Sequence, residues 1–168
     1  MQDDPFSTTL PDPRDPAWEP RADHMRTALR QAQRAADQKE VPIGAAIYFG
    51  NRLIAQAYNQ VETLKDPTAH AEVIAITQAA SALGDWRLTG CVLYVTKEPC
   101  PMCAGAIILA RLPMVVWGVT DPQRGGAVSR FQILQNPAMN HRTEFRAGFM
   151  EEECRTLLSG FFKELRSS

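Results

Sequence analysis

The pattern of apolar and polar positions predicts four helices in the chain. Apolar residues repeat at helical spacing in three of them, and the fourth opens directly after Pro99. Proline or glycine follows the first two patterns and ends them. The predicted helices run from about Arg21 to about Lys39, from Asp66-Pro67-Thr68 to Gly84, from Cys100 or Pro101 to about Arg111, and along the apolar stripe from Met150 to Leu165.

Strands predicted by the same pattern are interspersed with these helices. Two of them flank the turn Gly50-Asn51 and should pair as an antiparallel hairpin. Strands that alternate with helices indicate an α/β fold in which helices cover a sheet. The predicted strands are Ile43–Phe49, Leu53–Tyr58, Cys91–Thr96, Met114–Val119 and, from a weaker pattern, Thr143–Ala147.

Composition places a boundary near residue 20. Residues 1–20 hold five prolines, and five acidic residues stand there against Arg14 alone. This segment shows no periodicity, so we expect an extended, proline-rich acidic tail. Residues 21–168 should form one domain, which is long enough to bury a hydrophobic core.

Charge and hydropathy narrow the range of partners. The chain has a net charge of −1, and the part after residue 20 holds 17 basic and 14 acidic residues. That small excess is compatible with RNA contact but does not favour a general coating of DNA, so no DNA partner is expected. The longest apolar run, Cys103–Ala110, is too short to span a bilayer, and the acidic start lacks the apolar segment of a signal peptide. We therefore expect a cytoplasmic protein without a membrane partner.

Two short motifs carry the candidate chemistry. His70-Ala71-Glu72 is an H-x-E motif, and Pro99-Cys100-Pro101-Met102-Cys103 is a P-C-x-x-C motif. A catalytic zinc ion takes three protein ligands and leaves a fourth position for water. His70, Cys100 and Cys103 supply those three ligands, which predicts one zinc ion per chain. Glu72 is left over beside the imidazole, where a carboxylate can move a proton.

Other interpretations of Cys-x-x-Cys are a redox pair and half of a structural zinc site. A redox pair does not explain the H-x-E motif. A structural site needs a fourth ligand, and the remaining histidines and cysteines are not paired at ligand spacing. Cys91 and Cys154 are most simply buried thiols, which suits a reducing compartment.

The motif residues predict hydrolysis of an amine from a nucleobase ring. Zinc-bound hydroxide would attack the ring carbon, while Glu72 would take the water proton, pass it to the ring nitrogen and help ammonia to leave. Asn59 lies at the end of the predicted hairpin and could read the edge of a base. It could equally be a turn residue that ends a strand.

Residues 40–165 resemble the bacterial tRNA-specific adenosine deaminases of the cytidine deaminase-like superfamily. Several purine and pyrimidine deaminases share the first three of the matching runs, whereas the last two are more particular to the tRNA enzymes. The matching runs are Glu40-Val41-Pro42-Ile43-Gly44-Ala45, Asp66-Pro67-Thr68-Ala69-His70-Ala71-Glu72, Glu98-Pro99-Cys100-Pro101-Met102-Cys103-Ala104-Gly105-Ala106, Met139-Asn140-His141-Arg142, and the segment from Glu153-Cys154 to Phe161-Phe162.

This resemblance implies a three-layer α/β/α fold with a mixed five-stranded sheet, a homodimer, and conversion of adenosine to inosine at the wobble position of tRNA. It makes His70, Cys100 and Cys103 the zinc ligands and Glu72 the proton shuttle. The partner would be the anticodon stem-loop. The predicted substrate contacts are Asn59 at the target base, Asp121 near a flanking nucleotide, and Ala71, His141 and Arg142.

Two further residues carry expectations of their own. His24 lies on the first predicted helix and should be a surface residue. Glu98 should either orient a metal ligand or form an ordinary ion pair.

Two alternative functions remain on the sequence. The first is a deaminase of a free purine or pyrimidine base or nucleotide, of the guanine or cytosine type, since such enzymes share the zinc motif. The second is a non-catalytic zinc-containing RNA-binding subunit, although such partners typically lose the glutamate that Glu72 provides here.

Overall fold

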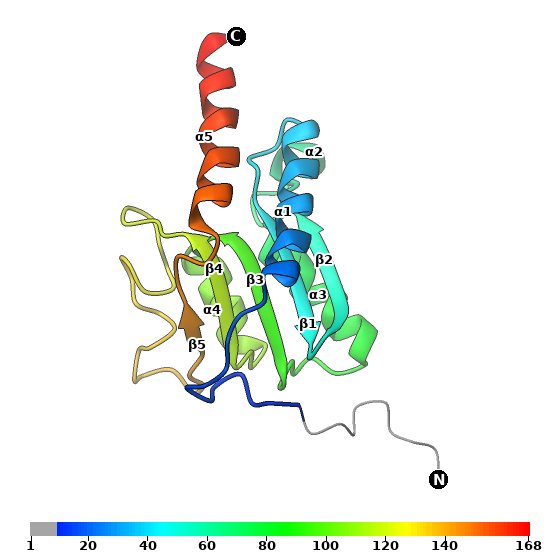
Figure 1. Ribbon diagram of the computed structural model, residues 1–168, viewed down its shortest axis with the longest axis vertical. Helices are drawn as coiled ribbons and strands as arrows, with labels where there is room; N and C mark the ends of the chain where they lie inside the picture. The colour runs from blue at the N-terminus through cyan, green and yellow to red at the C-terminus, as the bar shows by residue number, and fades with distance from the viewer. Residues whose placement is uncertain (1–9) are drawn as a thin grey trace.

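The computed structural model describes residues 10–168 and shows one sheet between two layers of helices (Figure 1). This is the three-layer α/β fold that the sequence predicts. The elements in chain order are α1 Ala22–Asp37, β1 Gly44–Phe49, β2 Arg52–Tyr58, α2 Val61–Leu64, α3 Ala71–Leu83, β3 Cys91–Lys97, α4 Pro101–Leu109, β4 Met114–Val119, β5 Glu144–Arg146 and α5 Glu151–Ser167.

The sheet is mixed and has the strand order β2-β1-β3-β4-β5. β1 pairs antiparallel with β2 and with β3, whereas β3, β4 and β5 run parallel. The predicted hairpin is therefore confirmed, with Gly44 opposite Tyr58 and Phe49 opposite Arg52. Its turn requires Gly50, which has φ +58°, a conformation that side chains with a Cβ rarely adopt.

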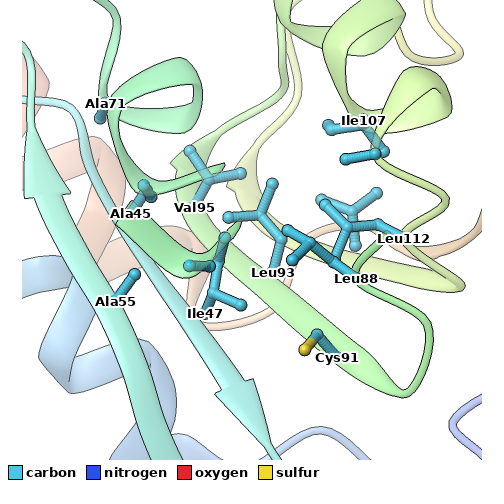
Figure 2. Close-up of a cluster of buried hydrophobic side chains, with 14 of the residues drawn as sticks. Ala45, Ile47, Ala55, Ala71, Leu88, Cys91, Leu93, Val95, Ile107 and Leu112 are labelled. Carbon is cyan, nitrogen blue, oxygen red and sulfur yellow. The ribbon is translucent and has the colours of Figure 1, made fainter. Parts of the chain in front are cut away.

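One face of the sheet is covered by α3 and α4. Alternate residues of the strands, such as Ala45 and Ile47 of β1, point toward these helices and are fully buried. Figure 2 shows this cluster, in which Leu93 and Val95 of β3 lie between β1 and the segment that contains Leu112. The cluster anchors the two helices that carry the candidate metal ligands.

The opposite face is covered by α1 and α5. Ala46 and Tyr48, the intervening residues of β1, pack there with Met25 of α1 and Cys154 of α5. The start of α5 packs on this face through Cys154, and the rest of the helix extends beyond the ends of the strands (Figure 1). The predicted apolar stripe of this helix is accordingly buried at Cys154 and Leu158 but 54% exposed at Leu165.

The expectation that His24 is a surface residue is wrong. Its imidazole stacks on Tyr48 with ring centroids 3.6 Å apart, contacts Tyr94 edge-on, and leaves the residue only 4% exposed. The helix pattern misassigned it because a histidine counts as polar, while here two tyrosines of the sheet provide an aromatic pocket. Burial lowers the pKa of His24 below its usual value of 6.5.

Residues 10–20 contain neither a helix nor a strand. Their backbone turns at Asp12–Trp18, where the amides of Asp15 and Trp18 bond to carbonyls three residues earlier. Trp18 packs against the buried cluster under α1, and a Cβ at Gly50 would meet the side chain of Leu10 at 2.6 Å. This half of the predicted tail therefore lies against the domain, while its first nine residues lie outside the described part of the chain.

One predicted helix start is displaced. Asp66 was expected to open the helix, but its carboxylate accepts the amide and the hydroxyl of Thr68 and forms a separate turn. α3 begins only at Ala71, with His70 as its extended N-cap residue. No helix within residues 10–168 has the length and apolarity that crossing a bilayer requires.

The burial of His24 predicts a pH dependence of stability. As the pH falls below 6.5, the unfolded chain takes up a proton on His24 that the folded chain resists, so the free energy of unfolding should decrease from about pH 7 to about pH 5. The variant His24→Phe, which keeps an aromatic ring on Tyr48, should show a shallower decrease in this range. Urea denaturation at several pH values measures both slopes, and parallel curves would contradict the assignment.

Candidate active site

The three predicted metal ligands lie at the beginnings of two neighbouring helices. His70 is the N-cap residue of α3, and Cys100 is the N-cap residue of α4, which follows β3. Pro101 occupies the first turn of α4, where its missing N–H costs nothing, and Cys103 follows in the same turn. Helix N-termini carry positive partial charge, which lowers the cost of holding thiolates there.

The donor atoms of these ligands converge. His70 Nδ1 lies 3.5 Å from Cys100 Sγ and 3.4 Å from Cys103 Sγ, and the three ligand atoms lie within 4.8 Å of one another. A tetrahedral zinc ion with ordinary bond lengths separates nitrogen and sulfur by about 3.5–3.6 Å. One imidazole and two thiols at these distances fit the zinc ion, and this group could hold a metal.

The electrostatic environment favours a thiolate at Cys100. Hydrogen bonds that the Cys100 thiolate accepts from Cys103 and from His70 lower the pKa of Cys100 to about 4 despite its partial burial. The same contact with Cys100, together with burial, raises the pKa of Cys103 well above its usual range. The contact with Cys100 also raises the pKa of His70, so the imidazole and the two sulfurs act as one coupled group.

Glu72 follows the N-cap histidine in the first turn of α3. It is 4% exposed, and burial raises the pKa of its carboxyl above the usual value of 4.5. It lines the same cavity as His70 and Cys100. A carboxyl group beside the ligands, but outside the converging set, is placed to exchange a proton with a reacting molecule.

A cavity of about 380 Å³ opens over these residues. The predicted residues Asn59, Ala71 and Asp121 line it together with His70, Glu72 and Cys100, whereas Cys103 is fully buried behind it. The structure therefore brings most of the predicted site residues together. The remaining lining residues are Glu40, Val41, Ile43, Val61, Glu62, Lys97, Glu98, Arg124 and Phe162.

Asn59 is 6% exposed and its amide is oriented by the backbone. Its Nδ2 donates to the carbonyl oxygen of Val41 at 3.4 Å, a long hydrogen bond. The side chain is thus held at the wall of the cavity, and it also follows the last residue of β2. Asn59 therefore both follows the end of a strand and lines the cavity.

The structure places His141 and Arg142 away from this cavity. The Nε2 of His141 lies 2.9 Å from the carbonyl oxygen of Leu112, and the Nε of Arg142 lies 3.5 Å from a carboxylate oxygen of Glu144. His141 and Arg142 line a separate depression in the segment before β5. They are not brought together with Asn59 or Glu72 in the described chain.

The cavity contains several residues beyond the predicted substrate contacts. Lys97 ends β3 and pairs with the carboxylate of Asp121 at 2.9 Å. Arg124 and Phe162 reach the cavity from the loop after β4 and from α5. The resemblance pointed to Phe161-Phe162 as a motif, and the structure shows that Phe162 reaches the cavity although α5 is remote in sequence.

The expectations for Glu98 are both wrong. Its carboxylate forms no ion pair within residues 10–168, and its hydrogen bonds go to backbone amides and the hydroxyl of the segment 121–129, not to a predicted metal ligand. The sequence could not show this, because the partners lie 23 to 31 residues further along the chain.

The fold and this site define a deaminase, and the model of the MafB19-like deaminase family matches residues 20–166. A tRNA-specific adenosine deaminase of Bacillus subtilis (strain 168) is 47% identical over 85% of this chain and 89% of its own. A solved structure of a tRNA:A34 deaminase, from work on A-to-I editing at the wobble position, is 40% identical with a TM-score of 0.79, over 82% of this chain and 100% of its own. A guanine deaminase of Bacillus subtilis is less similar, at 29% identity and a TM-score of 0.58 over 89% and 96%. The chain belongs to the tRNA-specific adenosine deaminase family, which confirms the resemblance seen in the sequence.

The close packing behind the site predicts that Gly126 tolerates no side chain. The Gly126 amide donates to Pro99 O at 2.8 Å, and a Cβ there would lie 2.2 Å from Pro101 N and 2.4 Å from Cys100 C. Because these are backbone atoms, Gly126→Ala should lower the free energy of unfolding by about 1–3 kcal/mol. The control is Gly160→Ala on α5, where nothing lies within 4 Å and alanine favours the helix. Chemical denaturation compares them, and equal stabilities would refute the packing argument.

Proposed function

We propose that this protein hydrolyses the exocyclic amine of adenosine at the wobble position of a tRNA anticodon, giving inosine and ammonia. The observation that carries the proposal is the placement of Glu72 beside the converging His70, Cys100 and Cys103 in one cavity. Membership of the tRNA-specific adenosine deaminase family supports adenosine in tRNA as the substrate.

We assign the metal as zinc, with one ion per chain held by His70, Cys100 and Cys103. When bound, zinc lowers the pKa of water to about 7 and so supplies a hydroxide nucleophile at neutral pH. Glu72 is buried at the wall of the same cavity. Its carboxylate accepts the proton of the attacking water, delivers it to the ring nitrogen next to the reacting carbon, and assists the departure of ammonia.

The other cavity residues orient the base. The Asn59 side chain is held by its long contact with Val41, which leaves its amide oxygen to accept a hydrogen bond from a base edge. Ala71 has a short side chain, so a flat ring can approach the backbone of α3 there. Asp121 and Arg124 lie at the cavity wall formed by the loop after β4, where a nucleotide next to the target base would lie.

We further propose a homodimer in the cytoplasm as the working form. Apolar side chains stand exposed on α4, with Met102 at 36% and Leu109 at 68%, and a second copy of the chain would cover them. All four cysteines are free thiols, in keeping with a reducing compartment. His141 and Arg142 lie outside the cavity, so we assign them to contacts with the RNA beyond its target nucleotide.

Glu72→Gln tests the chemical step. The glutamine has nearly the same shape but cannot carry the proton, so turnover should fall by about 10²–10⁴-fold, the usual contribution of a general acid or base. The zinc content should remain one per chain, since Glu72 is not among the ligands. Metal analysis and single-turnover inosine formation provide the measurement, and a rate near that of the unaltered protein would assign the proton transfer to another group.

A synthetic anticodon stem-loop with adenosine at the wobble position tests the substrate. Nucleoside analysis should find inosine in this RNA and little or none from free adenosine, because the loop supplies phosphate contacts that a nucleoside lacks. Binding should weaken steeply with added salt, and Arg124→Gln should weaken it further and reduce the salt dependence. Equal rates on the nucleoside and the stem-loop would favour a free-base deaminase, as would product from free guanine or cytosine alone. Bound zinc without any release of ammonia would favour a non-catalytic subunit.

A further inference from the structure

A buried glutamate that forms no ion pair within residues 10–168 lies beside the candidate metal centre. Glu98 connects β3 to the cysteine motif and is 4% exposed. Its Oε1 accepts hydrogen bonds from the amide of Asp121 at 3.1 Å and from the hydroxyl of Ser129. Its Oε2 accepts the amides of Val128 at 3.0 Å and Ser129 at 2.9 Å. The four donors all belong to residues 121–129, which we call the 121–129 loop.

These four hydrogen bonds take the place of an ion pair. A carboxylate withdrawn from water is costly unless its oxygens are satisfied, and backbone amides that donate to a charged oxygen form stronger bonds than neutral pairs. Glu98 holds the first residue of the loop and its last two. The side chain of Glu98, which lies outside the loop, thereby links the two ends of the loop to each other.

The loop also packs closely against the cysteine motif. The amides of Gly126 and Ala127 donate to Pro99 O at 2.8 and 3.3 Å. A Cβ at Gly125 would lie 2.4 Å from Oε2 of Glu98, so only glycine allows this approach. The loop therefore has one preferred position relative to Cys100, and Glu98 is the group at its centre.

The loop carries two charged groups that belong to the wall of the candidate active site. Asp121 and Arg124 both line the cavity. Asp121 Oδ1 in turn accepts the amides of Gln123 and Arg124, while Oδ2 pairs with Lys97 at 2.9 Å. The position of the loop thus sets the position of an anionic and a cationic side chain at the wall of the cavity.

We propose that Glu98 is a positioning residue for substrate binding, which acts by holding the 121–129 loop against the cysteine motif. Glu98 lines the cavity, but both of its oxygens accept hydrogen bonds from the loop, so we assign it no part in proton transfer. Its hydrogen bonds within residues 10–168 involve none of the three metal ligands, so it does not hold the metal. The part that concerns substrate affinity rests on the proposed function.

The test uses Glu98→Gln in the zinc-loaded full chain. In Glu98→Gln an NH₂ group replaces one carboxylate oxygen. This group cannot accept hydrogen bonds from the loop amides, so the bonds that this oxygen accepted are lost. Hydrogen exchange at the amides of Asp121, Val128 and Ser129 should then quicken by at least about ten-fold, as expected when bonds to a charged group are lost. The KM for the anticodon stem-loop should rise by about ten-fold or more, because Asp121 and Arg124 lose their fixed places. The zinc content and, within about three-fold, kcat should stay unchanged.

Two further variants frame this result. Glu153→Gln on the exposed side of α5 is the matched control, since it makes the same chemical change away from the loop and should alter neither exchange nor KM. Ser129→Ala removes the hydroxyl donor alone and should move both quantities in the same direction by a smaller factor. It also keeps the proposal testable if Glu98→Gln does not fold.

Three results would overturn the proposal. Loss of zinc from Glu98→Gln would show that Glu98 supports the metal. A fall in kcat with unchanged KM would place it in the chemical step. Unchanged exchange in the loop, in Glu98→Gln or in a folded Ser129→Ala, would show that Glu98 does not hold it. If the unaltered protein does not deaminate the stem-loop, the proposed function fails, while exchange and zinc content still decide whether Glu98 holds the loop.

Discussion

The convergence of one imidazole and two thiols is the constraint on which this structure depends. His70 lies 30 residues before Cys100, yet their donor atoms are 3.5 Å apart. They meet because α3 and α4 cover the same face of the sheet, and their first residues come together beside the end of β3. Each ligand-bearing segment begins a helix, so its backbone amides contribute positive potential at the centre. The buried cluster between the sheet and the helices α3 and α4 fixes the N-termini of these two helices relative to each other. The geometry of the site therefore depends on the packing of the sheet as well as on the two motifs.

The walls of the cavity depend on a second device, a buried carboxylate that binds backbone amides. Glu40, 1% exposed, accepts the amides of Glu62 and Thr63 at 3.2 and 2.6 Å and so fixes the start of α2 on one wall. Glu98 fixes the 121–129 loop on the other. In both cases the buried carboxylate accepts hydrogen bonds from backbone N–H groups, so the irregular segments around the cavity are ordered without an ion pair to Glu40 or Glu98 within residues 10–168.

Local charge matters more here than the net charge of −1. At the cavity wall the carboxylate of Asp121 pairs with Lys97 and accepts hydrogen bonds from two backbone amides. Arg124 lines the same cavity and forms no ion pair within residues 10–168, so it is available to a phosphate. A chain that is nearly neutral can therefore present a positive group to an anionic substrate where the chemistry takes place.

The sequence by itself determined four of the five helices of the described chain, the hairpin and the α/β class, and its motifs pointed to the His70, Cys100 and Cys103 group that converges in the structure, because periodicity and motif spacing are local properties that neighbouring residues decide. Only the tertiary structure decided how distant segments meet. α2 has just four residues and forms on the carboxylate of Glu40, and Asp66 makes a turn of its own while His70 caps α3. His24 is buried because two tyrosines from other elements enclose it, and Glu98 finds its donors in a loop more than twenty residues away. None of these contacts leaves a repeating pattern in the chain, since each depends on the path of the backbone between its partners.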